Sequence, residues 1–208
     1  MRALLVVDLQ NDFMPGGSLA VPDGDATVPV ANALMPAFTL VVATQDWHPA
    51  DHGSFAVNHP GHVPGDMVEL GGVPQVLWPA HCVQGSNGAD FHPDLRVVDI
   101  DRVVHKGTDP GIDSYSTFYD NARQKETGLD AFLKSHDVDE LVILGLATDY
   151  CVLFSALDAI ELGYAVTVVR DGCRGIDLAE GDSERAYEKM AAAGAAIVDS
   201  GVVLATAG

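Results

Sequence analysis

A cysteine, an aspartate and a lysine each stand at the end of an apolar run of the sequence. Cys151 lies where the run Leu141–Leu144 gives way to a helical pattern. Asp8 ends the first apolar run, and Lys106 follows soon after a pair of valines. In open parallel sheets the carboxyl ends of the strands form the ligand-binding edge, so all three side chains are expected there. A thiol with an acid to take its proton and a cation beside it has the composition of an activated nucleophile.

Cys151 is expected in the first turn of a helix that begins at Thr148. Unpaired N–H groups and the positive end of the helix dipole favour a thiolate at this position. The same N–H groups can hold the oxyanion that forms on an attacked carbonyl. As an alternative, a free cysteine is most often a small buried residue. Covalent catalysis is therefore predicted from the three groups together and not from the cysteine alone.

A second group of residues suits a divalent metal ion. Asp46 and His48 are separated by one residue, so in an extended segment both side chains point the same way. His81, much later in the chain, completes a set of one carboxylate and two imidazoles. Such a set binds zinc, iron(II) or manganese(II) and leaves positions for water or substrate. His52 is a further candidate, as a ligand or as a hydrogen-bond partner of one. Ordinary loop polarity is the alternative reading.

The elements that must position these residues alternate between strands and helices. Runs rich in Val, Ile and Leu predict strands buried on both faces, as in a parallel sheet, at Ala3–Val7, Leu40–Ala43, Val103–Val104, Leu141–Leu144, Ala165–Val169 and Ala195–Val198. Helical patterns occupy Thr27–Phe38, Gly128–His136, Thr148–Leu162 and Ser183–Ala193. This alternation predicts βαβ units and an α/β fold.

The segment from about residue 45 to 101 interrupts the alternation. It has little periodicity and holds six of the eight histidines. A long stretch without regular structure in a compact domain is usually functional, so we expect the metal and the substrate to bind here. No repeat or charged linker divides the chain, and residues 1–208 are expected to form a single domain.

The composition excludes several classes of function. The net charge is −19, with only 11 Lys and Arg, so the chain should repel nucleic acid and anionic membranes. No run of apolar residues is long enough for a transmembrane helix, and the first apolar run is too short for a secretory signal. Three irregularly spaced cysteines suggest no disulfide framework, so a reducing cytoplasm is the expected location.

Five motifs together resemble the nicotinamidase/pyrazinamidase branch of the isochorismatase-like hydrolases. They occur in the order found in that family and span residues 6–152, about two-thirds of the chain, and they read VVDLQNDF, ATQDWHP, WPAHCVQG, HKG and GLATDYCV. Each motif alone is unspecific, whereas the full set is highly specific. The resemblance implies a three-layer α/β/α sandwich with a mainly parallel sheet.

The resemblance also implies roles for the reactive residues. It makes Cys151 the nucleophile, Asp8 the proton acceptor and Lys106 the charged partner of both. It assigns Asp46, His48 and His81 to one divalent metal ion, most plausibly zinc, with iron or manganese as alternatives.

Further residues match the substrate pocket of the family. Phe13 and Trp78 resemble the aromatic walls on either side of a substrate ring, and Tyr115 matches a pocket-lining tyrosine less closely. The Leu146–Ala147 bond matches a cis peptide, and the N–H groups of Ala147 and Cys151 match an oxyanion hole. Core packing is the alternative for the aromatic residues.

The implied activity is hydrolysis of nicotinamide to nicotinate and ammonia, and of pyrazinamide as well, through a Cys151 thioester. Isochorismatase-type enzymes need no cysteine, and carbamoyl-type amidases are not expected to carry this metal set. The alternative from another class of function is a catalytically silent module that binds a pyridine ligand. Small molecules are the expected partners; the native metal, the role of His52 and assembly into a homo-oligomer stay open.

Overall fold

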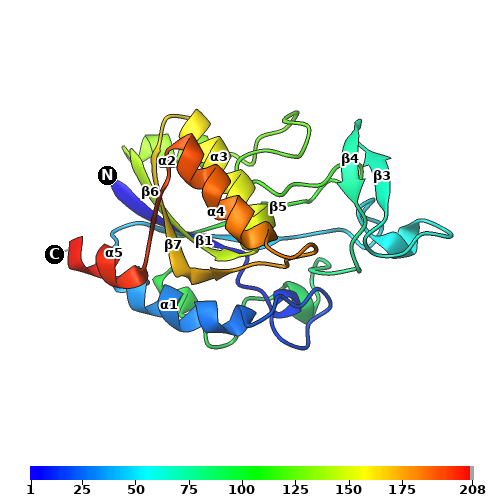
Figure 1. Ribbon diagram of the computed structural model, residues 1–208, viewed down its shortest axis with the longest axis horizontal. Helices are drawn as coiled ribbons and strands as arrows, with labels where there is room; N and C mark the ends of the chain where they lie inside the picture. The colour runs from blue at the N-terminus through cyan, green and yellow to red at the C-terminus, as the bar shows by residue number, and fades with distance from the viewer. Residues whose placement is uncertain (207–208) are drawn as a thin grey trace.

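A computed structural model describes residues 1–206 as a sheet of parallel strands covered by helices (Figure 1). The strands of the main sheet are β1 Arg2–Val7, β2 Val41–Asp46, β5 Arg102–Lys106, β6 Glu140–Leu146, β7 Ala165–Arg174 and β8 Ala196–Val198. The helices are α1 Thr27–Leu34, α2 Leu129–Ser135, α3 Leu153–Glu161, α4 Asp182–Ala193 and α5 Ser200–Thr206. A separate hairpin consists of β3 Met67–Leu70 and β4 Val73–Val76.

The main sheet has the strand order β5-β2-β1-β6-β7-β8, and every neighbouring pair is parallel. β1 lies in the middle and is buried from Ala3 to Val7, as is β6 from Leu141 to Leu146. Strands buried on both faces carry continuous rather than alternating apolar runs, which is the pattern that predicted them. The expected α/β fold with a mainly parallel sheet is confirmed.

Helices cover both faces of this sheet and produce the three layers (Figure 1). α3 and α4 lie together on one face, whereas α1 and α5 lie on the other. α2 is anchored near the end of α3, because the Tyr164 hydroxyl donates a 2.7 Å hydrogen bond to Asp130. No helix in residues 1–206 has the length and apolarity needed to span a membrane.

Several element boundaries differ from the sequence prediction. β2 extends to Asp46 and β5 to Lys106, because both polar residues continue the ladder and pair with each other in register. The segment 45–101 contains the β3–β4 hairpin, whose short strands carry no strong apolar pattern. α5 was not predicted. Thr148–Val152 forms a π-helical turn, and the α-helix begins only at Leu153.

Gly145 is required where β6 passes β1. Its φ is +128°, and a Cβ placed on it would lie 2.1 Å from the carbonyl oxygen of Val7. No side chain fits this approach without moving the backbone of the central strand.

Gly145→Ala is therefore expected to lower the free energy of unfolding by about 3 kcal/mol or more, from backbone strain and overpacking together. Gly163→Ala is the matched control, because Gly163 also has positive φ, +96°, but nothing lies within 4 Å of its Cβ position. That control should lose only about 1 kcal/mol. Urea denaturation measures both values, and equal losses would contradict the close approach.

Candidate active site

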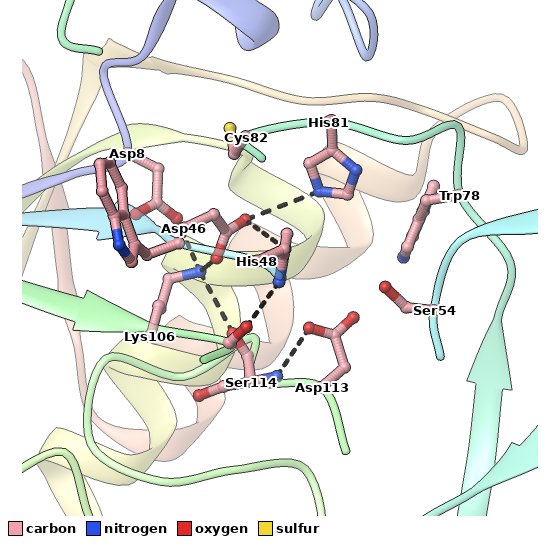
Figure 2. A network of polar contacts seen from close by, with 12 residues as sticks. Asp8, Asp46, His48, Ser54, Trp78, His81, Cys82, Lys106, Asp113 and Ser114 are labelled. Atoms are coloured by element: carbon pink, nitrogen blue, oxygen red, sulfur yellow. Dashed lines mark hydrogen bonds and ion pairs between the residues drawn. The ribbon is translucent and has the colours of Figure 1, made fainter. Parts of the chain in front are cut away.

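The Lys106 ammonium lies at the centre of a buried polar cluster (Figure 2). Its Nζ is 2.8 Å from Asp8 Oδ2, 3.3 Å from Cys151 Sγ and 3.2 Å from the carbonyl oxygen of Ser114. It also forms an ion pair with Asp46 Oδ1. The structure thus brings together the acid, the lysine and the thiol that the sequence predicted at one sheet edge.

Asp8 is held in place by its backbone and by a neighbouring strand. It follows β1 in the left-handed region, with φ 52°, a conformation that costs a non-glycine residue free energy. The Thr44 hydroxyl donates a 2.6 Å hydrogen bond to Asp8 Oδ1, and the Asp8 N–H donates back to that hydroxyl. Oδ2 is left to face Lys106. Asp8, Asp46 and Cys151 offer atoms that all lie within 4.8 Å of one another.

Burial and charge set the protonation states in this cluster. Burial works against the charged form of Lys106, but Asp46 and Asp8 outweigh it and raise the pKa of the lysine well above its usual value. Burial would raise the pKa of Asp46, yet Lys106 and His48 hold it well below the usual range. For Asp8, burial dominates and its pKa is raised. Asp8 is therefore a stronger base than an aspartate in water.

The thiol of Cys151 differs from the sequence expectation. Burial raises the pKa of Cys151 well above its usual value, and the neighbouring aspartates add to this, although Lys106 acts in the opposite direction. The predicted stabilisation of a resting thiolate is therefore not what this environment favours. A neutral thiol beside a basic carboxylate suits transfer of the thiol proton during attack.

The turn that carries Cys151 directs the thiol towards a cavity. The carbonyl of Ala147 accepts 3.1 Å hydrogen bonds from the N–H groups of Tyr150 and Val152, which closes the turn. Cys151 is only 6% exposed, and it lines the cavity together with Ala147. The Leu146–Ala147 peptide is cis, as the resemblance implied.

The three expected metal ligands form a second cluster that shares Asp46 with the first (Figure 2). Asp46 Oδ2 lies 3.7 Å from His48 Nε2 and 3.8 Å from His81 Nε2. Two donors bound to one ion at about 2.1 Å stand about 3–4 Å apart, so these separations fit a shared ion.

The hydrogen bonds of the two imidazoles occupy Nδ1 and leave Nε2 free to bind a metal. His48 Nδ1 is 2.8 Å from the carbonyl of Gly107, and His81 Nδ1 is 2.8 Å from the carbonyl of Pro79. A carbonyl accepts only from a protonated Nδ1, which leaves each Nε2 with a free lone pair. The residues present therefore fit a divalent ion.

His52 lies beside this set rather than within it. Its ring is tilted against that of His48 with 4.3 Å between the ring centroids, and its Nδ1 is 2.7 Å from Ser54 Oγ. Its Nε2 is buried without a hydrogen-bond partner among the described residues. His52 groups with His48 and Asp113 as donors, not with Asp46 and His81. The predicted hydrogen bond from His52 to a metal ligand is not among the contacts of the described residues, and His52 instead packs its ring against that of the expected ligand His48.

The cavity joins the nucleophile cluster to the metal set. Phe13, Trp78 and Tyr115 line it, as expected from the resemblance, together with Asp46, His81 and Cys151. Four further lining residues were not predicted: Leu19, Asp113, Tyr150 and Ile176. Tyr150 packs edge-on against Trp78 at 4.9 Å and against Tyr115 at 5.3 Å, which builds a continuous aromatic wall.

Two supporting residues also escaped the sequence prediction. Thr44 stands two residues before Asp46 on β2, so strand alternation could have placed both on one face. Gln10 fixes the backbone of Asp46 through hydrogen bonds of 2.8 Å in both directions. No spacing in the sequence marks this glutamine, because its partners come from distant segments.

Comparison with known proteins establishes the family of this chain. The family model described as the isochorismatase domain matches residues 2–201. A nicotinamidase of Escherichia coli (strain K12) is 54% identical over 200 residues, covering 94% of this chain and 93% of that protein. The chain belongs to the nicotinamidase branch of the isochorismatase-like hydrolases. All motifs that suggested this family lie within the matched residues.

Solved structures of this branch share the whole architecture. A nicotinamidase/pyrazinamidase from Acinetobacter baumannii has a TM-score of 0.94 at 46% identity, with 97% of each chain covered. A pyrazinamidase from Pyrococcus horikoshii, described in complex with zinc, has a TM-score of 0.78 at 39% identity, covering 95% of this chain and 98% of that one. The parallel sheet and its covering helices are thus those of a nicotinamidase-type hydrolase.

The metal cluster gives a prediction that needs no activity. His81→Ala should remove one of three donors and lower the bound zinc, measured by mass spectrometry after dialysis against the metal, by about tenfold or more. His62→Ala is the matched control, since His62 is exposed and, within residues 1–206, its side chain pairs only with Asp66. Full zinc content in the His81 variant would remove that residue from the proposed site.

The ion pairs of Lys106 predict a large effect on stability. Lys106→Met leaves two buried carboxylates without their cation, so the free energy of unfolding should fall by about 3–5 kcal/mol. Adding Asp8→Asn should recover part of this loss, because it removes one of the two uncompensated charges. Lys134→Met is the control, because Lys134 pairs with Asp130 at the surface, and should cost no more than about 1 kcal/mol. Denaturant titration measures the free energy of unfolding of each variant. A Lys106 variant as stable as the control would rule out the buried ion pairs.

Proposed function

We propose that this protein hydrolyses nicotinamide to nicotinate and ammonia through a covalent Cys151 thioester. The observation that carries the proposal is the common cavity of Cys151, Asp46 and His81, with Lys106 linking the thiol to two carboxylates. The nicotinamidase names of its relatives support the substrate. Pyrazinamide, with a similar ring and the same carboxamide, should also be hydrolysed.

In the first half of the reaction Asp8 takes the proton of Cys151 as the sulfur bonds to the carboxamide carbon. The electron pair of the carbonyl moves to its oxygen, and we assign the N–H groups of Ala147 and Cys151 to stabilise this oxyanion. When the carbonyl re-forms, the carbon–nitrogen bond breaks and Asp8 returns its proton to the departing nitrogen. Ammonia leaves, and the thioester remains.

In the second half a water molecule attacks the thioester carbon while Asp8 takes a proton from it. The carbon–sulfur bond breaks, Asp8 returns the proton to the sulfur, and the nicotinic acid that forms loses its remaining proton to solvent to give nicotinate. Lys106 stays protonated throughout and stabilises the negative charge that passes between Asp8 and Cys151. The raised pKa of Asp8 serves both transfers, because it makes the carboxylate a better base.

Asp46, His48 and His81 are proposed to hold one divalent ion, zinc as in the Pyrococcus horikoshii relative, with iron and manganese as alternatives. When bound, the ion would supply an open coordination position for the pyridine nitrogen, directly or through a water molecule. Phe13 and Trp78 are proposed to contact the two faces of the ring. Together these groups would fix the carboxamide beside Cys151.

The cellular setting is also proposed. Three free cysteines among the described residues fit a reducing cytoplasm, where nicotinate formation would serve NAD salvage. The net charge of −19 supports small molecules rather than nucleic acid or membranes as partners. A homo-oligomer is compatible with this proposal.

Ammonia release from nicotinamide tests the proposal. Cys151→Ala should lower kcat by about a thousandfold or more, since the nucleophile has no substitute. Cys173→Ala should keep kcat within about threefold, because Cys173 is buried outside the cavity. Wild-type protein that is silent on nicotinamide but releases ammonia from an N-carbamoyl compound would instead favour the carbamoyl-type amidase. Binding without ammonia release from any amide would favour the silent module.

A further inference from the structure

The β3–β4 hairpin lies away from the main sheet (Figure 1). It nevertheless contains one buried polar residue. Of the eight residues in its two strands, only Gln75 is buried, with 1% of its surface exposed. A buried amide costs free energy unless its hydrogen bonds are made, so the partners of Gln75 show what it contributes.

The partners of Gln75 belong to the wall of the active-site cavity. Its Nε2 carries two hydrogens, which three acceptors share: the carbonyl of Val76 at 2.8 Å, the Tyr115 hydroxyl at 2.9 Å and Asp113 Oδ2 at 3.0 Å. Its Oε1 accepts a 3.2 Å hydrogen bond from Asn121. Gln75 itself does not line the cavity.

The Tyr115 hydroxyl connects this amide to the second aromatic residue of the wall. It accepts a 3.2 Å hydrogen bond from Trp78 Nε1 in addition to its contact with Gln75. Trp78 comes two residues after β4, so the hairpin controls both its backbone and, through Gln75 and Tyr115, its ring. Asn121 completes the frame by accepting from the Tyr115 N–H at 2.9 Å.

We infer that Gln75 is a positioning residue for substrate binding, which fixes Trp78 and Tyr115 through the Tyr115 hydroxyl. This inference rests on the proposed function, because it concerns the same cavity. A glutamine is suited to this place since its amide offers donors to Tyr115 and Asp113 and an acceptor to Asn121. An apolar side chain of the same length would leave the tyrosine and the carboxylate without this partner.

Steady-state kinetics of Gln75→Met on nicotinamide test the inference. The variant should raise KM by about tenfold with kcat within about threefold, because the wall positions the ring and does not touch the reacting bond. Gln124→Met is the matched control, because Gln124 is exposed and its side chain makes no hydrogen bond among the described residues; it should change neither constant. A KM within about twofold of wild type in Gln75→Met would overturn the inference.

A double-mutant cycle with Tyr115→Phe separates positioning from a general structural effect. If Gln75 acts through the Tyr115 hydroxyl, Gln75→Met should raise KM by less than about twofold once that hydroxyl is absent. If Gln75→Met instead raised KM by the same factor with and without the Tyr115 hydroxyl, Gln75 would act through another contact. Should Gln75→Met fail to fold, Gln75→Leu takes its place, since it also removes the amide and adds no second carboxylate beside Asp113.

Tryptophan fluorescence gives a readout that does not depend on hydrolysis. The chain has two tryptophans, so Trp47→Phe leaves Trp78 as the only one. In that background Gln75→Met should lower the fluorescence anisotropy of Trp78, whereas Gln124→Met should not. Unchanged anisotropy overturns the inference whether or not nicotinamide is the substrate, while wild-type protein without amidase activity contradicts only the proposed function.

Discussion

The buried ammonium of Lys106 holds together groups that lie at or beyond the ends of different strands and are remote in sequence. An ammonium in the interior is stable only when its charge is compensated and its hydrogen bonds are made. Asp8, Asp46, Cys151 and the carbonyl of Ser114 do this together. The lysine therefore requires the parallel sheet to align the ends of β1, β2, β5 and β6 at one edge, and the fold in turn depends on this pairing to keep two carboxylates inside.

Asp46 makes the nucleophile cluster and the metal set one unit. One of its oxygens faces Lys106, and the other faces the Nε2 atoms of His48 and His81. The register of β2 and β5 places Asp46 directly opposite Lys106, so the sheet itself fixes this bridge. A single carboxylate would then fix the spacing between the metal side, where the ring is proposed to bind, and the thiol side, where the carboxamide is proposed to react. The sequence suggested two separate constellations because it cannot show that one residue serves both.

Residues at strand ends could be predicted because the periodicity of a buried parallel strand marks where it stops. Asp8, Lys106 and Cys151 were placed at one edge on this basis, and the βαβ alternation determined the fold class. The protonation of Cys151 could not be predicted in the same way. Its position near a helix start favoured a thiolate, but the depth of burial, which has the opposite effect, follows from packing that only the structure shows. The π-helical turn is likewise invisible to a pattern of apolar residues.

The segment 45–101 resisted prediction for a different physical reason. Its order comes from polar contacts between distant segments rather than from an apolar face with a regular period. Gln10 holds the backbone of Asp46, the Asp12 carboxylate accepts a 2.7 Å hydrogen bond from the N–H of Cys82, and Gln75 holds Tyr115. Such hydrogen bonds fix both the direction and the distance between two groups, whereas apolar packing constrains them less strictly. A cavity that must orient a small planar molecule gains from walls fixed in this way, and the residues that fix them are those that no periodicity reveals.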